Sequence, residues 1–268
     1  MNEPAQGEPC KWWGDFTIPE SHFRDWQLGP LTLRIVNLQN EWQVIHSQDE
    51  DPWLSGVSVS EPAQWGDHEE SLVGERLRFA VNDGSEQIFL FPALADRSIV
   101  ARPDTPLSLP AGEDVAVYVT SPLWLKIALA DGERVLMELP TFRPKDTWLG
   151  PSNTQGQLCY GSRDPARLYL EGVPNNPTRV ICKMRIANKS DATIQLPRVL
   201  LPTGLLKLFV DRERRFWTQE LTLEMGKELE PVLGRGAPVE AIDPREVSEC
   251  RSASQSKSLL TALGGMLG

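Results

Sequence analysis

The stretch that decides the fold class is Arg179-Val-Ile-Cys-Lys-Met-Arg-Ile-Ala187. Apolar residues occupy every second position from 180 to 186, and Lys183 and Arg185 lie between them. Successive side chains of a β-strand point to opposite faces. This period of two therefore predicts a strand with one apolar face.

Similar runs, separated by turn residues, lie on both sides of this stretch. On its C-terminal side, residues 188–191 predict a turn and residues 217–225 predict one closing strand. On its N-terminal side, three pairs of runs predict hairpins: 31–37 with 41–46, 76–81 with 87–91 around Asn82-Asp83-Gly84, and 124–129 with 134–139 around Asp131-Gly132. No segment of ten or more residues before 227 has helical periodicity, so the sequence predicts an all-β fold.

Charge is distributed unevenly along the 268 residues. Residues 1–140 carry 9 basic and 23 acidic side chains, whereas residues 141–226 carry 13 and 8. Such asymmetry suggests separate structural units, although solvated basic strand faces would also explain it. We expect two β-sandwich-like lobes, an acidic Trp-rich one at 11–140 and a basic one at 141–226. Residues 227–268 are rich in Pro, Gly, Ser and charge, which predicts a flexible tail. A single larger sandwich is the alternative.

Composition argues against several classes of protein. A formal net charge of −10 is a poor match to a nucleic-acid binder. The N-terminus has no basic region followed by an apolar run, and no run of 18 apolar residues predicts a membrane span. The four cysteines have no CxxC spacing. We therefore expect a cytoplasmic protein with reduced thiols and no transmembrane segment.

No motif for catalysis, metal binding or cofactor binding stands out. The histidines at 22, 46 and 68 lack a second His or Cys at metal-ligand spacing, and no P-loop, GxSxG or GxGxxG occurs. Cys159 would need a remote histidine to act as a nucleophile, so we interpret it as a small buried strand residue. We predict a non-enzymatic protein without cofactor, metal or catalytic residues. The alternative is an enzyme with dispersed carboxylates around Asp146, because such carboxylates leave no motif.

Tryptophan is unusually common, with nine in the chain and six in the first 65 residues. Trp is usually buried, so most of these should pack in the core. Trp53 and Trp65 lie in loop-like acidic sequence, and we expect these two to be exposed. Exposed Trp can stack against a sugar ring or anchor a protein partner. A small-ligand or carbohydrate-binding β-sandwich is therefore a second hypothesis for the function.

Two further groups of residues are candidates for interaction. A helix at the C-terminal tip would have an apolar face suited to a groove or to peripheral membrane contact, although two glycines weaken it by about 1 kcal/mol each. A frayed terminus is the alternative. A basic group could face anionic lipid or an acidic partner. The apolar residues are Leu259, Leu263, Met266 and Leu267, and the basic residues are Arg212, Arg214 and Arg215.

The segment 143–161 bridges the two predicted lobes and is too long and Gly-rich for a simple turn. Its run Asp146-Thr-Trp-Leu-Gly-Pro151, followed by Gly156 and Leu158-Cys-Tyr160, resembles the central signature of the domain-of-unknown-function family number four hundred and thirty-two. The strand end at 185–188 and the strand around Trp217 resemble that family too, and the likeness covers residues 12 to about 225. It implies an all-β fold and carries over no catalytic residue.

The resemblance also implies a class of partner. Some members of that family are encoded beside, or fused to, small-conductance mechanosensitive channels, which implies an accessory role at the membrane. The sequence therefore favours a non-enzymatic interaction module with a protein partner, as an accessory or regulator of such a channel. Asp146 and Trp148, in the signature segment, are candidate interaction residues.

Overall fold

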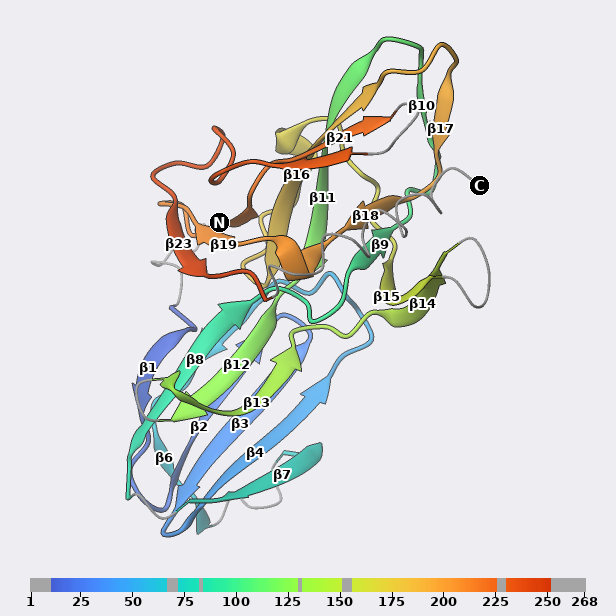
Figure 1. Ribbon diagram of the computed structural model, residues 1–268. Coiled ribbons are helices and arrows are strands. Elements are labelled where there is room, and N and C mark those ends of the chain that lie inside the picture. Colours follow the sequence, from blue (N-terminus) through green and yellow to red (C-terminus); the bar gives the residue numbers. More distant parts are fainter. Residues whose placement is uncertain are drawn as a thin grey trace, which may run out of the picture. The chain divides into compact units, whose positions relative to one another are not determined.

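The computed structural model describes residues 11–66, 72–81, 84–129, 132–150, 156–225 and 230–251, and these residues form an all-β protein (Figure 1). Contacts divide the chain into two units, and each unit is discontinuous in sequence. The first comprises residues up to 93 together with 124–142, and the second comprises 94–123 together with the chain from 143 onward. This division differs from the predicted continuous lobes, because residues 94–123 pair with strands of the second unit.

The first unit is built from two antiparallel sheets. One has the order β1-β8-β12-β13, and the other has the order β5-β2-β3-β4-β7 with β6 beside β2. The strands of the first sheet are β1 (Gly14–Thr17), β8 (Gln87–Ala93), β12 (Trp124–Leu129) and β13 (Arg134–Pro140). Those of the second are β2 (His22–Leu28), β3 (Leu31–Leu38), β4 (Glu41–Gln48), β5 (Val57–Val59), β6 (Ala63–Gln64) and β7 (Glu75–Ala80).

The two sheets of the first unit pack face to face around an apolar core (Figure 1). Phe16 of β1 meets Trp26 of β2 edge to face, with ring centroids 5.2 Å apart. Ile88 and Leu90 on β8 and Ile127 on β12 are fully buried. Each such side chain contributes roughly 1.5–3 kcal/mol when it leaves water. The alternate residues of β8, Phe89 and Phe91, therefore lie on the outer face of their sheet.

The predicted hairpins of this unit have different outcomes. β3 pairs with β4 from Leu31 to Gln48, and β12 pairs with β13, so these two hairpins are confirmed. The hairpin predicted around Asn82-Asp83-Gly84 is wrong, because β7 pairs with β4 and β8 pairs with β1 and β12. The chain crosses here from one sheet to the other. Residues 82 and 83 lie outside the described part.

The described residues of the second unit form three sheets. The largest has the order β22-β21-β16-β20-β19-β23, with β11 also paired to β16; a second has the order β14-β15-β9-β18, and β10 pairs with β17. The strands of the large sheet are β11 (Asp114–Pro122), β16 (Arg179–Asn188), β19 (Leu208–Val210), β20 (Phe216–Thr218), β21 (Leu221–Met225), β22 (Glu230–Leu233) and β23 (Arg245–Ser248). The others are β9 (Ile99–Ala101), β10 (Leu107–Leu109), β14 (Lys145–Leu149), β15 (Gln157–Ser162), β17 (Ile194–Leu196) and β18 (Val199–Leu201).

The strand β16 organises the large sheet, as its alternation predicts. Positions 180, 182, 184 and 186 are fully buried, while Arg185 is exposed. On one side β16 pairs antiparallel with all nine residues of β11, and on the other it pairs in parallel with β20 and β21. The closing strand predicted at 217–225 is therefore two strands, both beside β16.

Residues 170–173 and 237–241 cover the second face of β16. Ile181 packs with Tyr118, Phe209, Trp217 and Ala241 in a buried cluster. Part of the C-terminal region is thus structural, and the prediction of a flexible tail from 227 needs correction for residues 230–251. These residues contribute β22 and β23 to the large sheet. Residues 252–268, including the predicted apolar tip, lie outside the described residues.

Candidate functional site

The signature segment forms a β-hairpin at the edge of the four-stranded sheet. β14 pairs antiparallel with β15, and β15 pairs in parallel with β9. Leu149 and Cys159 are buried and fix one face of the hairpin to the second unit. Because side chains alternate along a strand, the neighbouring positions form the opposite face, which we call the hairpin face. It carries Asp146, Trp148, Leu158 and Tyr160.

Two arginines flank the ring of Tyr160. The guanidinium carbon of Arg97 lies 5.4 Å from the ring centroid, and that of Arg143 lies 5.5 Å from it. Both distances are in the range of cation–π contacts. The Tyr160 hydroxyl donates to Asp96 Oδ1 at 2.9 Å. Burial, and next this hydrogen bond, raise the pKa of Tyr160, so the phenol stays protonated at neutral pH.

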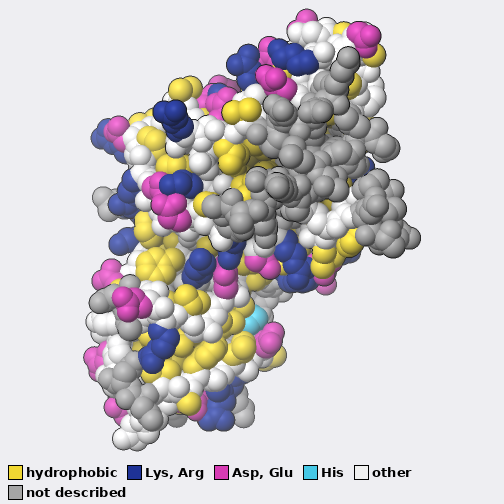
Figure 2. Space-filling model, viewed as in Figure 1, with side chains coloured by type: hydrophobic (Ala, Val, Ile, Leu, Met, Phe, Trp, Pro, Cys, Tyr) yellow, Lys and Arg dark blue, Asp and Glu magenta, His cyan; other side chains and the backbone are white. Residues whose placement is uncertain are grey.

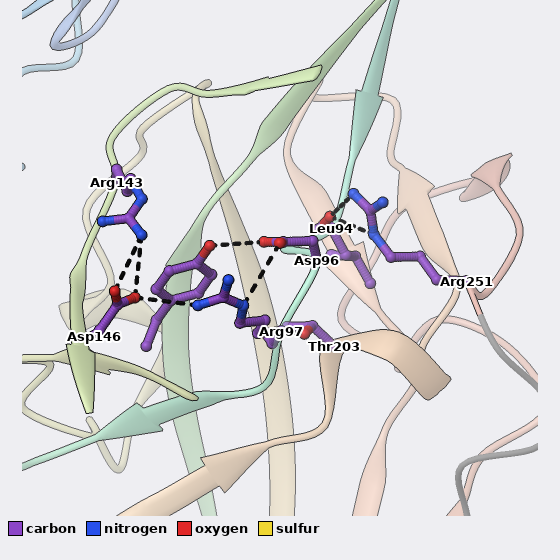
Figure 3. Close-up of polar contacts among 8 residues, drawn as sticks. Leu94, Asp96, Arg97, Arg143, Asp146, Thr203 and Arg251 are labelled. Carbon is purple, nitrogen blue, oxygen red and sulfur yellow. Dashed lines mark hydrogen bonds and ion pairs between the residues drawn. The ribbon is translucent and has the colours of Figure 1, made fainter. Parts of the chain in front are cut away.

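Asp146 joins the two arginines. Figure 3 shows Arg97 and Arg143 pointing toward its carboxylate from two sides. Arg143 Nη2 lies 3.2 Å from both carboxylate oxygens, and Arg97 Nη1 lies 3.3 Å from Oδ1. All three charged side chains are between about one third and one half exposed. Partly exposed ion pairs contribute little stability, typically below about 1 kcal/mol. Their effect here is to orient the three charged side chains around the buried ring of Tyr160.

Hydrogen bonds from distant segments fix the chain that carries Arg97. Thr203 Oγ1 donates to the Arg97 carbonyl oxygen at 2.7 Å, and Arg251 Nε donates to the Leu94 carbonyl oxygen at 3.0 Å (Figure 3). Thr203 begins the short 3₁₀ turn η4 (Thr203–Leu205) that follows β18. The position of Arg97 beside Tyr160 therefore depends on contacts with the segments that contain Thr203 and Arg251.

The other end of the hairpin face is apolar. Trp148 and Leu158 are direct cross-strand partners, and they are 43% and 46% exposed. Figure 2 shows hydrophobic side chains next to basic ones where β14 and β15 reach the surface. Gly156 allows the backbone before β15 to lie close to the end of β14, because a Cβ on Gly156 would lie 2.4 Å from the Leu149 carbonyl oxygen. An exposed Trp on the same strand face as an arginine-flanked carboxylate has the residue types of a protein-interaction hot spot.

The structure gives no support to nucleophilic chemistry at Cys159. Its thiol is fully buried, and burial raises its pKa to about 11. A thiol of that pKa is almost entirely protonated at neutral pH and is a poor nucleophile. Within the described residues, no three His, Cys, Asp or Glu side chains are grouped as metal ligands.

The two tryptophans that the sequence predicts to be exposed differ. Trp53 is 38% exposed, whereas Trp65 is only 8% exposed, so the prediction for Trp65 is wrong. Trp65 packs edge to face against Phe23 and lies 5.9 Å from the Arg34 guanidinium. It covers the outer face of the sheet that contains β2 and β3. The polar residues around Trp65 in the sequence therefore predicted exposure for a side chain that is buried.

The three basic candidates also differ in their surroundings. Arg212 and Arg214 are exposed. Arg215 instead bonds within its own loop, where Nε lies 3.1 Å from the buried carboxylate of Asp211 and the guanidinium lies over the Trp217 ring. Of the histidines, His46 is half-buried, and burial lowers its pKa against the opposing effect of Glu75. His68 lies outside the described residues, as do Leu259, Leu263, Met266 and Leu267.

Sequence reasoning named Asp146 and Trp148 but missed their partners. Arg97 and Asp96 lie about fifty residues earlier in the chain, and only the parallel pairing of β9 with β15 brings them to the hairpin. The exposure of Leu158 could have been predicted from the sequence. Adjacent residues of a strand point to opposite faces, and the neighbour Cys159 is predicted to be buried. The described part of the chain contains no helix with the length and hydrophobicity of a membrane span.

The site and fold together define an all-β protein with an ordered, partly apolar hairpin face. A family model, described as a protein of unknown function (DUF432), matches residues 12–266. The chain therefore belongs to this family. No curated protein and no solved structure matches it.

Proposed function

We propose that this protein is a non-enzymatic interaction module that binds a protein partner through its hairpin face. The observation that carries the proposal is the exposed pair Trp148 and Leu158, held in an ordered hairpin beside Arg97, Arg143 and Asp146. Large apolar side chains at the centre of a patch, with charged groups at its rim, are typical of protein interfaces.

The position of the hairpin in its sheet supports the same proposal. β14 is an edge strand among the described strands of its sheet. Edge strands present backbone donors and acceptors to which another chain can add. β14 begins with Lys145, and a lysine on an edge strand commonly protects against unspecific strand pairing. A partner that pairs with β14 would therefore have to be selective.

A membrane channel is the first class of partner that we propose. The support is the family resemblance of the signature segment, which implies an accessory role beside small-conductance mechanosensitive channels. The protein would then act in peripheral contact with the membrane, on the cytoplasmic side.

Affinity capture from a cell extract that retains its membranes tests the proposal. We expect the full-length protein to recover a partner that the double variant Trp148→Ala, Leu158→Ala loses. Tyr169→Ala is the matched control, because Tyr169 is a highly exposed aromatic residue elsewhere in the same unit. Equal recovery by the wild type and the double variant would contradict the proposal.

A further inference from the structure

A shallow hollow lies on the outer face of the β1-β8-β12-β13 sheet, in the first unit. Gly14, Asp15, Gln87, Phe89 and Phe91 line it, and its volume is about 450 Å³. This volume is within the range of about 300–1,000 Å³ of small-molecule sites. Figure 2 shows hydrophobic side chains gathered over β8, β12 and β13 on this face.

Two phenylalanine rings give the hollow an apolar surface. The rings of Phe89 and Phe91 lie nearly parallel, with an angle of 9° and centroids 6.3 Å apart. Gly132, at the β12–β13 turn, lets the Phe91 ring lie over the backbone: a Cβ there would be 2.8 Å from two ring carbons. The two rings are thus fixed by the fold and present part of their surface to the solvent.

Polar groups that can form further hydrogen bonds lie beside these rings. Within the described chain, the carboxylate of Asp15, which is directly opposite Phe89, has no hydrogen bond or ion pair. The Gln87 amide is oriented by its Nε2, which donates to Thr17 Oγ1 at 2.9 Å, and its oxygen is left to accept. Lys126, directly opposite Phe91 on β12, has no ion pair among the described residues either. The face therefore combines acceptors, a donor and aromatic rings.

We propose that this hollow binds a saccharide. A sugar ring has an apolar C–H face that packs on aromatic rings, and hydroxyl groups that both donate and accept. A purely apolar ligand would desolvate Asp15 and Gln87 without replacing their hydrogen bonds, which is costly. An anion would be repelled by Asp15, which lines the hollow. The site uses Phe rings, and so it differs from the Trp platform that the sequence suggests.

Native affinity electrophoresis tests the proposal with the full-length protein. The gels contain laminarin, xyloglucan, soluble starch, dextran or glycol chitin as probes. We expect at least one polysaccharide to retard the wild type, and both Phe89→Ala and Asp15→Ala to reduce the association constant by about tenfold. Trp53→Ala is the control, because it removes an exposed aromatic residue of the same unit that does not line the hollow.

Each other outcome overturns the proposal. Migration that none of the five polysaccharides changes would exclude a saccharide site. Retardation that survives both Phe89→Ala and Asp15→Ala, or that only Trp53→Ala abolishes, would place the sugar elsewhere. Asp15→Ala removes only an exposed carboxylate, so the test stays decisive if circular dichroism shows that Phe89→Ala misfolds.

Discussion

Trp148 and Leu158 are exposed cross-strand partners, while Leu149, the next residue of β14, is 1% exposed. Their substitutions should therefore separate binding from folding. We expect Trp148→Ala to lower the free energy of unfolding by at most about 1 kcal/mol. Leu149→Ala should lower it by about 2–5 kcal/mol, because it leaves a cavity in a packed region. Urea unfolding of the two variants checks this, and equal losses would contradict the assignment of the hairpin face.

The buried thiols give a second prediction for single residues. Burial raises the pKa of Cys159 to about 11 and that of Cys182 to about 12. At pH 8 only about one Cys159 thiol in a thousand is ionised, and the thiolate is the reactive form. Among the three cysteines in the described part of the chain, we expect iodoacetamide to label the half-buried Cys250 first, and Cys159 and Cys182 only in denaturant. Mass spectrometry of the labelled peptides measures the order, and rapid native labelling of Cys159 would contradict its burial.

The β14–β15 hairpin depends on the absence of a side chain at position 156. A Cβ there would lie 2.4 Å from the Leu149 carbonyl oxygen and 2.8 Å from the Cα of Gly150, so backbone must move. We expect Gly156→Ala to destabilise the protein by about 1–3 kcal/mol. Gly56→Ala is the matched control, since no atom lies within 4 Å of its added Cβ, and it should change stability by less than about 0.5 kcal/mol. Thermal or urea unfolding distinguishes the two.

An ionic contact ties the segment after β22 to the large sheet, and its stability depends on pH. Burial alone would raise the pKa of Glu240, but hydrogen bonds from Lys183 and Tyr118 outweigh it, so the pKa is lowered below 4.5. A carboxylate with a lowered pKa in the folded state stabilises the protein above its unfolded-state pKa. That contribution is lost as the pH falls through the folded-state pKa.

Glu240→Gln tests this contact. The variant should be less stable than the wild type by a constant amount between pH 5.5 and 7.5, and the difference should shrink as the pH falls below 4.5. Urea unfolding across this range measures it. A difference that does not change with pH would show that Glu240 does not act through its charge.

The elements that sequence alone could predict are those whose partners are adjacent in the chain. The β3–β4 and β12–β13 hairpins follow from alternation and from the turns between their strands. The same reasoning failed at Asn82-Asp83-Gly84, because the turn signal does not say whether the next strand stays in its sheet. It also failed for β22 and β23, which are edge strands of only four residues each and too short to show a clear alternation.

For the molecule as a whole, long-range pairing decides both the units and the site. The parallel pairing of β9 with β15 and the antiparallel pairing of β11 with β16 move residues 94–123 out of the first unit. No local pattern encodes such contacts. The same pairing brings Arg97 to Tyr160, so Asp146 and Trp148 could be predicted as candidates while the arginine pair around them could not.

Site-specific photo-crosslinking in living cells tests the interaction module most directly. The photoreactive amino acid p-benzoylphenylalanine replaces Leu158 in the full-length protein, or Tyr169 as an exposed position away from the hairpin face. We expect one dominant adduct with a partner protein from position 158, none from position 169, and loss of the adduct when Trp148→Ala is added. Equal adducts from both positions, or no adduct from position 158, would contradict binding through the hairpin face.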